Sequence, residues 1–387
     1  MRQAVCFVAG ALLVAGAARA EDAAPVPDFS QGATHVMPAA PANAAAPASA
    51  APAAESAAES AATSAPPRQS PEALACANVD GKASPEQRDA ACSKLIDSHQ
   101  WRGKDISWAY ANRCSVRVRL KQIDRALADC SEAIDQDPDL ASAYQLRAEI
   151  HRTRDERAKA LEDYDKAVAL GAKSAALFGG RGLVRLIEGD AAGALQDFDQ
   201  EVAIAGGVAE SWMDRGSAEL GVGDDVKAEQ DFAKAAELNP KDPQPWMNRG
   251  VAAIGQGDAS RARAFFGEAL KRDPHQTYAA LWRFIAADGS ADAAAELSAY
   301  AEKSNKDWPF AVTQLYLGRA EAAEAFGAAK TDDQQCEARF YVAHFQFMKG
   351  SAKDAALGLK RAVESCPKNF IEYFRAAADL KTLEAAK

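Results

Sequence analysis

The stretch SWMDRG at residues 211–216 returns as PWMNRG at residues 245–250, 34 residues further along the chain. Both copies place a tryptophan and a methionine before an aspartate or asparagine and an Arg-Gly pair. A catalytic motif seldom needs a second copy, whereas a structural repeat does. The spacing therefore indicates an internal repeat that carries a charged arginine at a position where an apolar residue is usual.

A 34-residue register aligns five segments without an insertion, at 107–140, 141–174, 175–208, 209–242 and 243–276. The fourth position is aromatic in all five, the eighth is small, the twentieth is alanine, and the twenty-fourth is aromatic in four. Large residues on one helix need small residues on its partner, so the pattern predicts antiparallel helix pairs that stack on one another. The aromatic residues of the fourth position, including Trp212 and Trp246, are expected in the core.

This pattern resembles the tetratricopeptide repeat, whose aromatic, small, small, aromatic, small and proline positions the five segments follow. The resemblance implies an all-α fold, a right-handed α-solenoid of antiparallel helix pairs. After residue 276 the register is lost, and residues 277–335 are expected to form degenerate helical pairs. Residues 336–369 fit a final repeat, and residues 370–387 fit a C-terminal capping helix.

An N-terminal capping helix region is expected over residues 73–106. Ser84 is a favourable N-cap, Pro85 suits the first helical position, and Gln87 completes a capping box. Before this region, residues 21–72 consist mostly of alanine, proline and serine and have few large apolar side chains. Such a composition predicts a disordered linker.

The first 20 residues have the features of a secretory signal peptide, with Arg2, an apolar run and the sequence Ala18-Arg19-Ala20. The alternative is an uncleaved membrane anchor, but the apolar run is short for a bilayer. Cys6 lies inside that run, which does not support a lipid anchor. The sequence thus predicts an exported protein, in the periplasm of a Gram-negative bacterium or secreted.

The net charge of the chain is acidic. Loss of the signal peptide removes two of the 45 basic side chains and none of the 55 acidic ones, which leaves 43 against 55 and a formal charge of −12. An acidic surface argues against nucleic acid and anionic lipid as partners. We therefore expect no nucleic acid partner and no membrane insertion after signal cleavage.

Six cysteines remain outside the signal peptide, an even number that favours disulfides in an oxidising compartment. In the geometry that the tetratricopeptide resemblance implies, positions eight and twenty-four of a repeat face each other. The start of the first helix in the final repeat likewise lies beside the end of the second. The expected pairs are Cys114–Cys130, Cys336–Cys366 and, by remainder, Cys76–Cys92. The alternative is that some of these cysteines are reduced and act as small apolar residues.

The seventh position, usually leucine in this repeat, is arginine in all five segments. The twenty-third position is aspartate in four segments and Phe265 in the fifth. Two charged columns with one period predict a ladder of ion pairs. The alternative is an arginine stripe that binds an anionic ligand. The columns consist of Arg113, Arg147, Arg181, Arg215 and Arg249, and of Asp129, Asp163, Asp197 and Asp231.

The concave groove of tetratricopeptide repeats is lined by positions two, five, nine, twelve and thirteen. In the third to fifth segments these positions include eight apolar residues, two of them methionines, which suits a helical or extended apolar peptide. The alternative is that several of them pack against neighbouring helices. The residues are Leu183, Leu186, Ile187, Met213, Leu220, Met247, Val251 and Ile254.

No catalytic motif stands out: the five histidines form no metal-spaced pair, and GxSxG, HExxH and P-loop motifs are absent. We expect no enzyme activity, no cofactor and no metal site. The predicted function is a non-catalytic periplasmic scaffold or adaptor that binds protein or peptide partners in its concave groove. Residues 308–318 and 339–363 also resemble exported repeat proteins of the new-lipoprotein-I type, which implies envelope proteases and cell-wall hydrolases as partners. The alternative is an accessory component of an envelope polysaccharide or secretion system.

Overall fold

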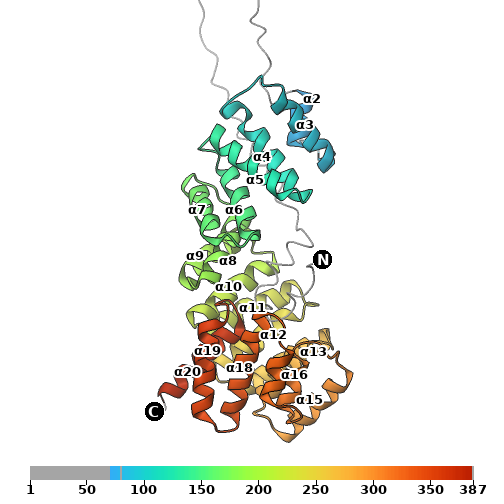
Figure 1. The fold of residues 1–387 in the computed structure, drawn as a ribbon, viewed down its shortest axis with the longest axis vertical. Helices are drawn as coiled ribbons and strands as arrows, with labels where there is room; N and C mark the ends of the chain where they lie inside the picture. The colour runs from blue at the N-terminus through green and yellow to red at the C-terminus, as the bar shows by residue number, and fades with distance from the viewer. Residues whose placement is uncertain (1–69, 79–80, 386–387) are drawn as a thin grey trace, which may run out of the picture. The chain divides into compact units, whose positions relative to one another are not determined.

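The computed structural model describes residues 70–78 and 81–385, and all regular secondary structure in these ranges is α-helical (Figure 1). The predicted signal peptide and most of the predicted linker lie outside the described residues. The chain divides into two compact units with a boundary between Ala172 and Lys173. The predicted all-α class is confirmed.

The N-terminal unit contains three helix pairs. Within each pair the two helices follow each other through a short turn and pack together. Their bounds are α2 (Pro71–Ala77), α3 (Pro85–Asp97), α4 (Lys104–Arg119), α5 (Ile123–Gln136), α6 (Ala141–Thr153) and α7 (Arg157–Ala169).

The start of the N-terminal unit differs slightly from the expectation. The capping box of α3 forms as predicted, because Ser84 Oγ accepts from the Gln87 amide at 3.2 Å and Gln87 Oε1 accepts from the Ser84 amide at 2.8 Å. Helix α2 begins at Pro71, inside the residues assigned to the linker. Ser70 caps it by accepting a hydrogen bond from the Ala73 amide, and proline at the first helical position favours this start.

The C-terminal unit begins with three long helix pairs, α8–α9, α10–α11 and α12–α13, and then becomes less regular. Four helices follow before the long pair α18–α19 and the terminal helix α20, and three of these four have only 7 to 9 residues. The bounds are α8 (Ala175–Glu188), α9 (Ala191–Ala205), α10 (Ala209–Val222), α11 (Asp225–Leu238), α12 (Gln244–Gly255), α13 (Ala259–Arg272), α14 (Thr277–Ile285), α15 (Ala291–Lys303), α16 (Phe310–Tyr316), α17 (Ala322–Ala328), α18 (Asp332–Met348), α19 (Ala352–Ser365) and α20 (Ile371–Ala385).

The small and large positions of the register meet inside each helix pair, as their pattern requires. A Cβ atom added to Gly216 of α10 would stand 2.6 Å from Cε1 of Phe232 on α11, and one added to Gly182 would stand 2.7 Å from Cε1 of Phe198. No side chain fits at such distances, so the absence of a Cβ lets the two helices approach. Phe198 and Phe232 are fully buried as a result.

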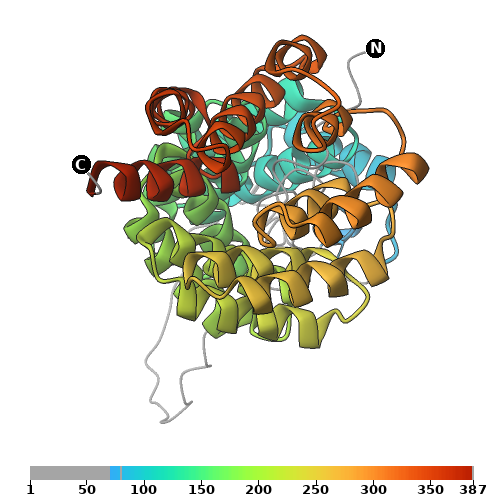
Figure 2. The same cartoon turned by 90° about the horizontal axis from the view of Figure 1, so that it is seen from below.

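The end of the C-terminal unit packs back against its beginning. Lys368, between α19 and α20, donates a hydrogen bond from Nζ to the carbonyl oxygen of Glu188 at the end of α8, at 3.0 Å. Phe374 of α20 reaches α10, where its Cε1 lies 3.7 Å from the place of a Cβ on Gly221. Figure 2 shows α20 next to the green helices at the start of the same unit. The terminal helix therefore contacts the first helices of the unit as well as the last repeat.

Candidate functional site

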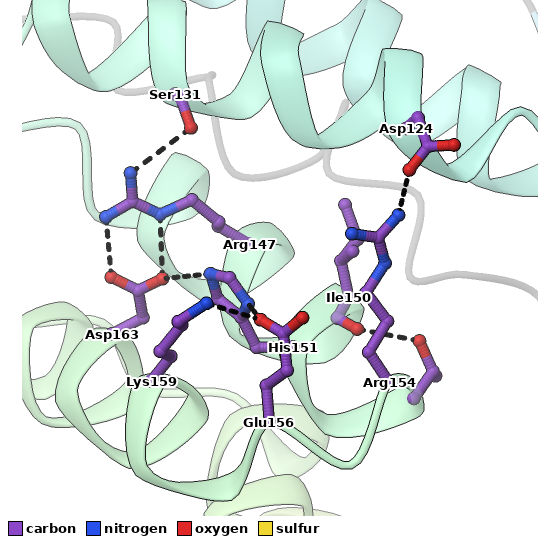
Figure 3. Close-up of polar contacts among 10 residues, drawn as sticks. Asp124, Ser131, Arg147, Ile150, His151, Arg154, Glu156, Lys159 and Asp163 are labelled. Atoms are coloured by element: carbon purple, nitrogen blue, oxygen red, sulfur yellow. Dashed lines mark hydrogen bonds and ion pairs between the residues drawn. The ribbon is translucent and has the colours of Figure 1, made fainter.

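The arginine column forms bidentate pairs with the aspartate column inside the helix pairs. In the second repeat, Arg147 of α6 donates from Nε and Nη2 to the two carboxylate oxygens of Asp163 on α7, both at 2.8 Å. Its third nitrogen, Nη1, donates to Ser131 of α5 at 3.3 Å, so the same side chain also reaches the preceding pair (Figure 3). Hydrogen bonding to Asp163 raises the pKa of Arg147. Arg147 thereby connects α6 to both α5 and α7.

The same geometry recurs in three other repeats. The aspartates of the column are 2–5% exposed, so each would be a costly buried charge without its arginine. The fork geometry of arginine matches a carboxylate and adds orientation to the charge attraction. The distances are 3.0 and 2.8 Å for Arg113–Asp129, 3.0 and 2.5 Å for Arg181–Asp197, and 2.8 and 2.8 Å for Arg215–Asp231.

The fifth arginine has a different environment. Arg249 lies with its Cζ 4.0 Å from the ring centroid of Phe265, which replaces the aspartate. Its Nη2 donates to Glu229 Oε1 of the preceding pair at 3.3 Å. Burial lowers the pKa of Arg249, in contrast to the rise for Arg147 and Arg215. The four bidentate pairs leave little arginine charge for an anionic ligand.

The aromatic residues of the fourth position support the arginines from their other side. Cζ of Arg215 lies 4.8 Å from the Trp212 ring centroid, and Cζ of Arg249 lies 4.8 Å from that of Trp246. Both tryptophans are half-buried and pack against the core from its edge. The expectation that they lie inside the core is therefore wrong. The reason is that each ring has to reach the guanidinium, which stays near the surface.

His151 of α6 also takes part in this internal polar network. Its Nδ1 lies 2.7 Å from Glu156 Oε2, and its Nε2 lies 3.8 Å from Asp163 Oδ2 (Figure 3). The side chain is buried. The contacts place His151 in a structural role between the helices of its pair.

The structure joins the cysteines in the three expected pairs. Cys76–Cys92 links α2 to α3, Cys114–Cys130 links α4 to α5, and Cys336–Cys366 links α18 to the residue after α19. Each bond therefore connects the two members of one helix pair. All six cysteines are buried.

Most of the residues expected to line the concave groove are in the core. Leu183 and Leu186 cluster with Phe198 and Ala218, within the first two pairs of the C-terminal unit. The large core cluster, which continues into α18 and α20, takes up four others: Met213, Leu220, Met247 and Val251. Six of the eight are 1–7% exposed. This agrees with the alternative interpretation, in which these residues pack against neighbouring helices. Only Ile187 and Ile254 are half-buried.

Two buried carboxyl groups connect the less regular helices to the C-terminal end. Glu337 of α18 accepts hydrogen bonds on Oε2 from Tyr278 Oη of α14 at 2.6 Å and from Trp308 Nε1 at 2.8 Å. Glu372 of α20 accepts on Oε1 from Tyr341 Oη at 2.9 Å. Burial raises the pKa of Glu337 to about 7, and burial together with the charge of Glu337 raises that of Glu372 well above its usual value.

The sequence pattern did not reveal these two carboxyl groups. Glu337 and Glu372 lie outside the 34-residue register of the first five segments, and their partners are distant in the chain. A glutamate within an apolar, aromatic-rich stretch was the available signal, as in CEARFYVAHF at 336–345. Both carboxyl groups are almost fully enclosed, so we assign them to the packing of α14, α18 and α20.

A surface pocket of about 600 Å³ lies between α17, α18 and α19. Its lining combines apolar side chains with arginine, glutamine and aspartate. The residues are Phe326, Gly327, Gln335, Arg339, Val342, Ala343, Gln346, Asp354, Leu357, Gly358 and Arg361. None of them was predicted as a binding residue.

Across residues 70–78 and 81–385, no three histidine, cysteine, aspartate or glutamate side chains gather in a way that could hold a metal ion. Within those same ranges, every helix is too short or too polar to cross a membrane.

The fold and the paired columns define a class: an all-α helical repeat protein, built as a solenoid of antiparallel helix pairs. Residues 243–276 match the family model described as tetratricopeptide repeat, and they are the residues of the fifth segment in the register. This match identifies a tetratricopeptide repeat in the fifth segment. No curated protein matches it with significant sequence similarity.

Several solved structures are similar to parts of this chain. YrrB, described as a TPR protein with an unusual peptide-binding site, is 21% identical, with a TM-score of 0.47 over 49% of this chain and 96% of its own. A tetratricopeptide repeat protein from Parabacteroides merdae is 16% identical, with a TM-score of 0.49 over 72% of this chain and 98% of its own. PilF of Pseudomonas aeruginosa is 18% identical, with a TM-score of 0.44 over 58% of this chain and 97% of its own.

Proposed function

We propose that this protein is a non-catalytic, exported scaffold that binds protein or peptide partners in the periplasm. The observation that carries the proposal is the stack of helix pairs whose recurring polar residues are satisfied internally. For example, the guanidinium groups of Arg147 and Arg215 form bidentate hydrogen bonds with Asp163 and Asp231. Helix pairs that are fastened in this way leave their surface residues available to partners.

The export part of the proposal rests on the disulfides and on the predicted signal peptide. Three disulfides within single helix pairs are typical of proteins that fold in an oxidising compartment. In the periplasm, envelope proteases and cell-wall hydrolases are the first partners to test, because the C-terminal stretches resemble the new-lipoprotein-I type.

The concave face near Ile187 and Ile254 is the proposed partner surface of the third to fifth repeats. These two side chains are the members of the expected groove that are only half-buried. They project from the first helices of their pairs, α8 and α12, as the lining of a tetratricopeptide groove does. The other six groove residues stabilise the fold beneath them.

The test is affinity purification from periplasmic extract with the mature chain, residues 21–387, followed by binding measurements with each purified partner. We expect specific proteins that bind the purified chain directly. Ile187→Glu with Ile254→Glu should weaken binding about tenfold or more, because a charge would be buried at the contact. Val226→Glu is the matched control, since Val226 is 54% exposed on α11. Retention of glycans on an array, with no protein bound, would contradict the scaffold proposal and favour a polysaccharide-related role.

A further inference from the structure

We propose that the pocket between α17, α18 and α19 binds an amphipathic helix of a partner protein, with acidic side chains directed at Arg339 and Arg361. The proposal rests on the scaffold function above and specifies a partner surface and a partner chemistry. It is independent of the concave face near Ile187 and Ile254.

The pocket exists because one helix of the stack is too short. In the regular repeats, the second helix of one pair packs along the first helix of the next, as α9 does on α10 and α11 on α12. Helix α17 occupies that place before α18, but it has 7 residues, whereas α18 has 17 and α19 has 14. At a rise of about 1.5 Å per residue, α17 covers about 10 Å of a helix that is about 25 Å long. The part of α18 that α17 does not cover lines the pocket together with the adjoining face of α19.

Two hydrogen bonds join α17 to α18 at one end of the pocket. Gln335 of α18 donates from Nε2 to the carbonyl oxygens of Phe326 at 3.1 Å and of Ala329 at 2.9 Å. These bonds tie the end of α17 to the start of α18. A segment that entered the pocket would therefore continue from the end of α17 along the two longer helices.

The open surface has the shape and polarity of a helix-binding groove. Its bottom is formed by small and apolar residues, with Ala343 and Gly358 where α18 and α19 touch, since a Cβ on Gly358 would lie 2.6 Å from the Ala343 Cβ. Val342 is buried there, whereas Leu357 on the rim is 54% exposed. Apolar side chains at helical spacing that face a shallow groove are the usual contacts of a docked amphipathic helix.

The positively charged side chains of the pocket favour a partner with acidic side chains. Arg339 donates from Nη1 to Ser365 Oγ at 3.1 Å, and neither Arg339 nor Arg361 forms an ion pair with any described residue. Asp354 is the single carboxylate of the lining. Two arginines against one aspartate give this pocket a positive balance on a chain with a net charge of −10. Acidic side chains of a partner are therefore the complement, and guanidinium groups bind carboxylates in paired geometry.

A helix is the expected occupant because the pocket takes the place of a missing second helix. The protein itself provides a suitable probe: residues 224–238, which cover α11 with its cap, read DDVKAEQDFAKAAEL. This segment is amphipathic, carries five acidic and two basic residues, and presents Phe232 to the small residues of a neighbouring helix. A fluorescein-labelled peptide of this sequence, with blocked ends, mimics the full-length second helix whose place before α18 is taken by the 7-residue α17.

The experiment measures the fluorescence anisotropy of this peptide with the mature full-length chain. We expect saturable binding that is weakened about tenfold or more by Arg361→Glu and by Leu357→Ser, because both side chains are exposed and their loss leaves the fold intact. Val226→Ser should leave the affinity unchanged. A control peptide with all acidic residues replaced by their amides should bind at least about tenfold more weakly.

Three results would overturn the proposal. They are absence of binding by the acidic peptide, equal binding by its amide form, and unchanged binding by the Arg361→Glu and Leu357→Ser variants. Complete displacement of the peptide by citrate at equal concentration would instead identify a site for small carboxylates. The Arg361→Glu variant can also be used in the periplasmic purification. If it still retains the partners of the parent protein, the scaffold function is supported and this pocket is excluded as their binding site.

Discussion

Arg249 lies over the ring of Phe265, with 4.0 Å between Cζ and the ring centroid, at the repeat position where Arg215 holds Asp231 through two hydrogen bonds of 2.8 Å. The column thus uses two ways to keep an arginine between two helices. A carboxylate neutralises the charge in four repeats, and an aromatic face with Glu229 of the preceding pair supports it in the fifth. The stems of these side chains cover apolar surface in both cases.

The first prediction concerns the arginine column. Arg215→Met should lower the free energy of unfolding by about 2–4 kcal/mol, because Asp231 would remain buried without its partner. Arg249→Met should cost less, since no aspartate faces it in its own pair and Glu229 also pairs with Arg261. Urea denaturation of both variants measures the difference. Equal losses would contradict the assigned role of Asp231, and a stable Arg215→Met variant that had lost a ligand would favour the anion-binding alternative.

The second prediction concerns the small position of the repeat. Gly250→Ala should destabilise the protein by about 1–3 kcal/mol, because the added methyl group would meet the ring of Phe266. Gly267→Ala is the matched control: it is also helical, and its nearest neighbours outside its own helix lie at 3.9 Å. The control should be neutral or slightly stabilising, since alanine is favoured over glycine in a helix. Thermal unfolding followed by circular dichroism compares the two, and similar melting temperatures would refute the packing argument.

The third prediction concerns the pH dependence of stability. In the folded protein the pKa of Glu337 is raised to about 7 from an ordinary value of 4.5, chiefly by burial. Between these values the folded state binds more protons than the unfolded state, so the free energy of unfolding should decrease as the pH rises from 4.5 to 7. The contribution is on the order of 3 kcal/mol at full ionisation.

Glu337→Gln tests this directly, because an amide oxygen can still accept from Tyr278 and Trp308 while the group no longer ionises. The variant should be more stable than the parent above pH 7 and should lose that part of the pH dependence. The pKa of Glu372 shifts in the same direction, so some dependence should remain. A pH profile of unfolding that is identical in the parent and in Glu337→Gln would refute the assignment.

The fourth prediction concerns the disulfide of the first repeat. Cys114→Ala with Cys130→Ala should lower the free energy of unfolding by about 3 kcal/mol, because the bond closes a loop of 16 residues in the unfolded chain. Guanidinium denaturation measures the loss. The parent protein in reductant should unfold at a lower guanidinium concentration than the oxidised parent. Equal denaturation midpoints for the oxidised parent and the double variant would show that the bond does not stabilise the fold.

The helix pairs and most of their internal contacts follow from the local sequence pattern. Arg147 and Asp163, or Gly216 and Phe232, are 16 residues apart, and such pairs lie within one helix hairpin. A contact of this kind repeats with the register, so the period of the sequence displays both partners at once. The capping box at Ser84 is equally local. The same reasoning placed the cysteines of each pair together.

The packing of the C-terminal unit depends on contacts between residues that are far apart in the sequence. Tyr278 and Glu337 are 59 residues apart, and Lys368 and Glu188 are 180 apart, so no period relates them. The core extends to α20 and includes Met213 and Met247, which the repeat pattern alone assigned to an open groove. The pocket beside Arg361 also depends on α17 being shorter than the helices it precedes. Local pattern specifies each hairpin, whereas the final packing depends on how hairpins of unequal length cover one another.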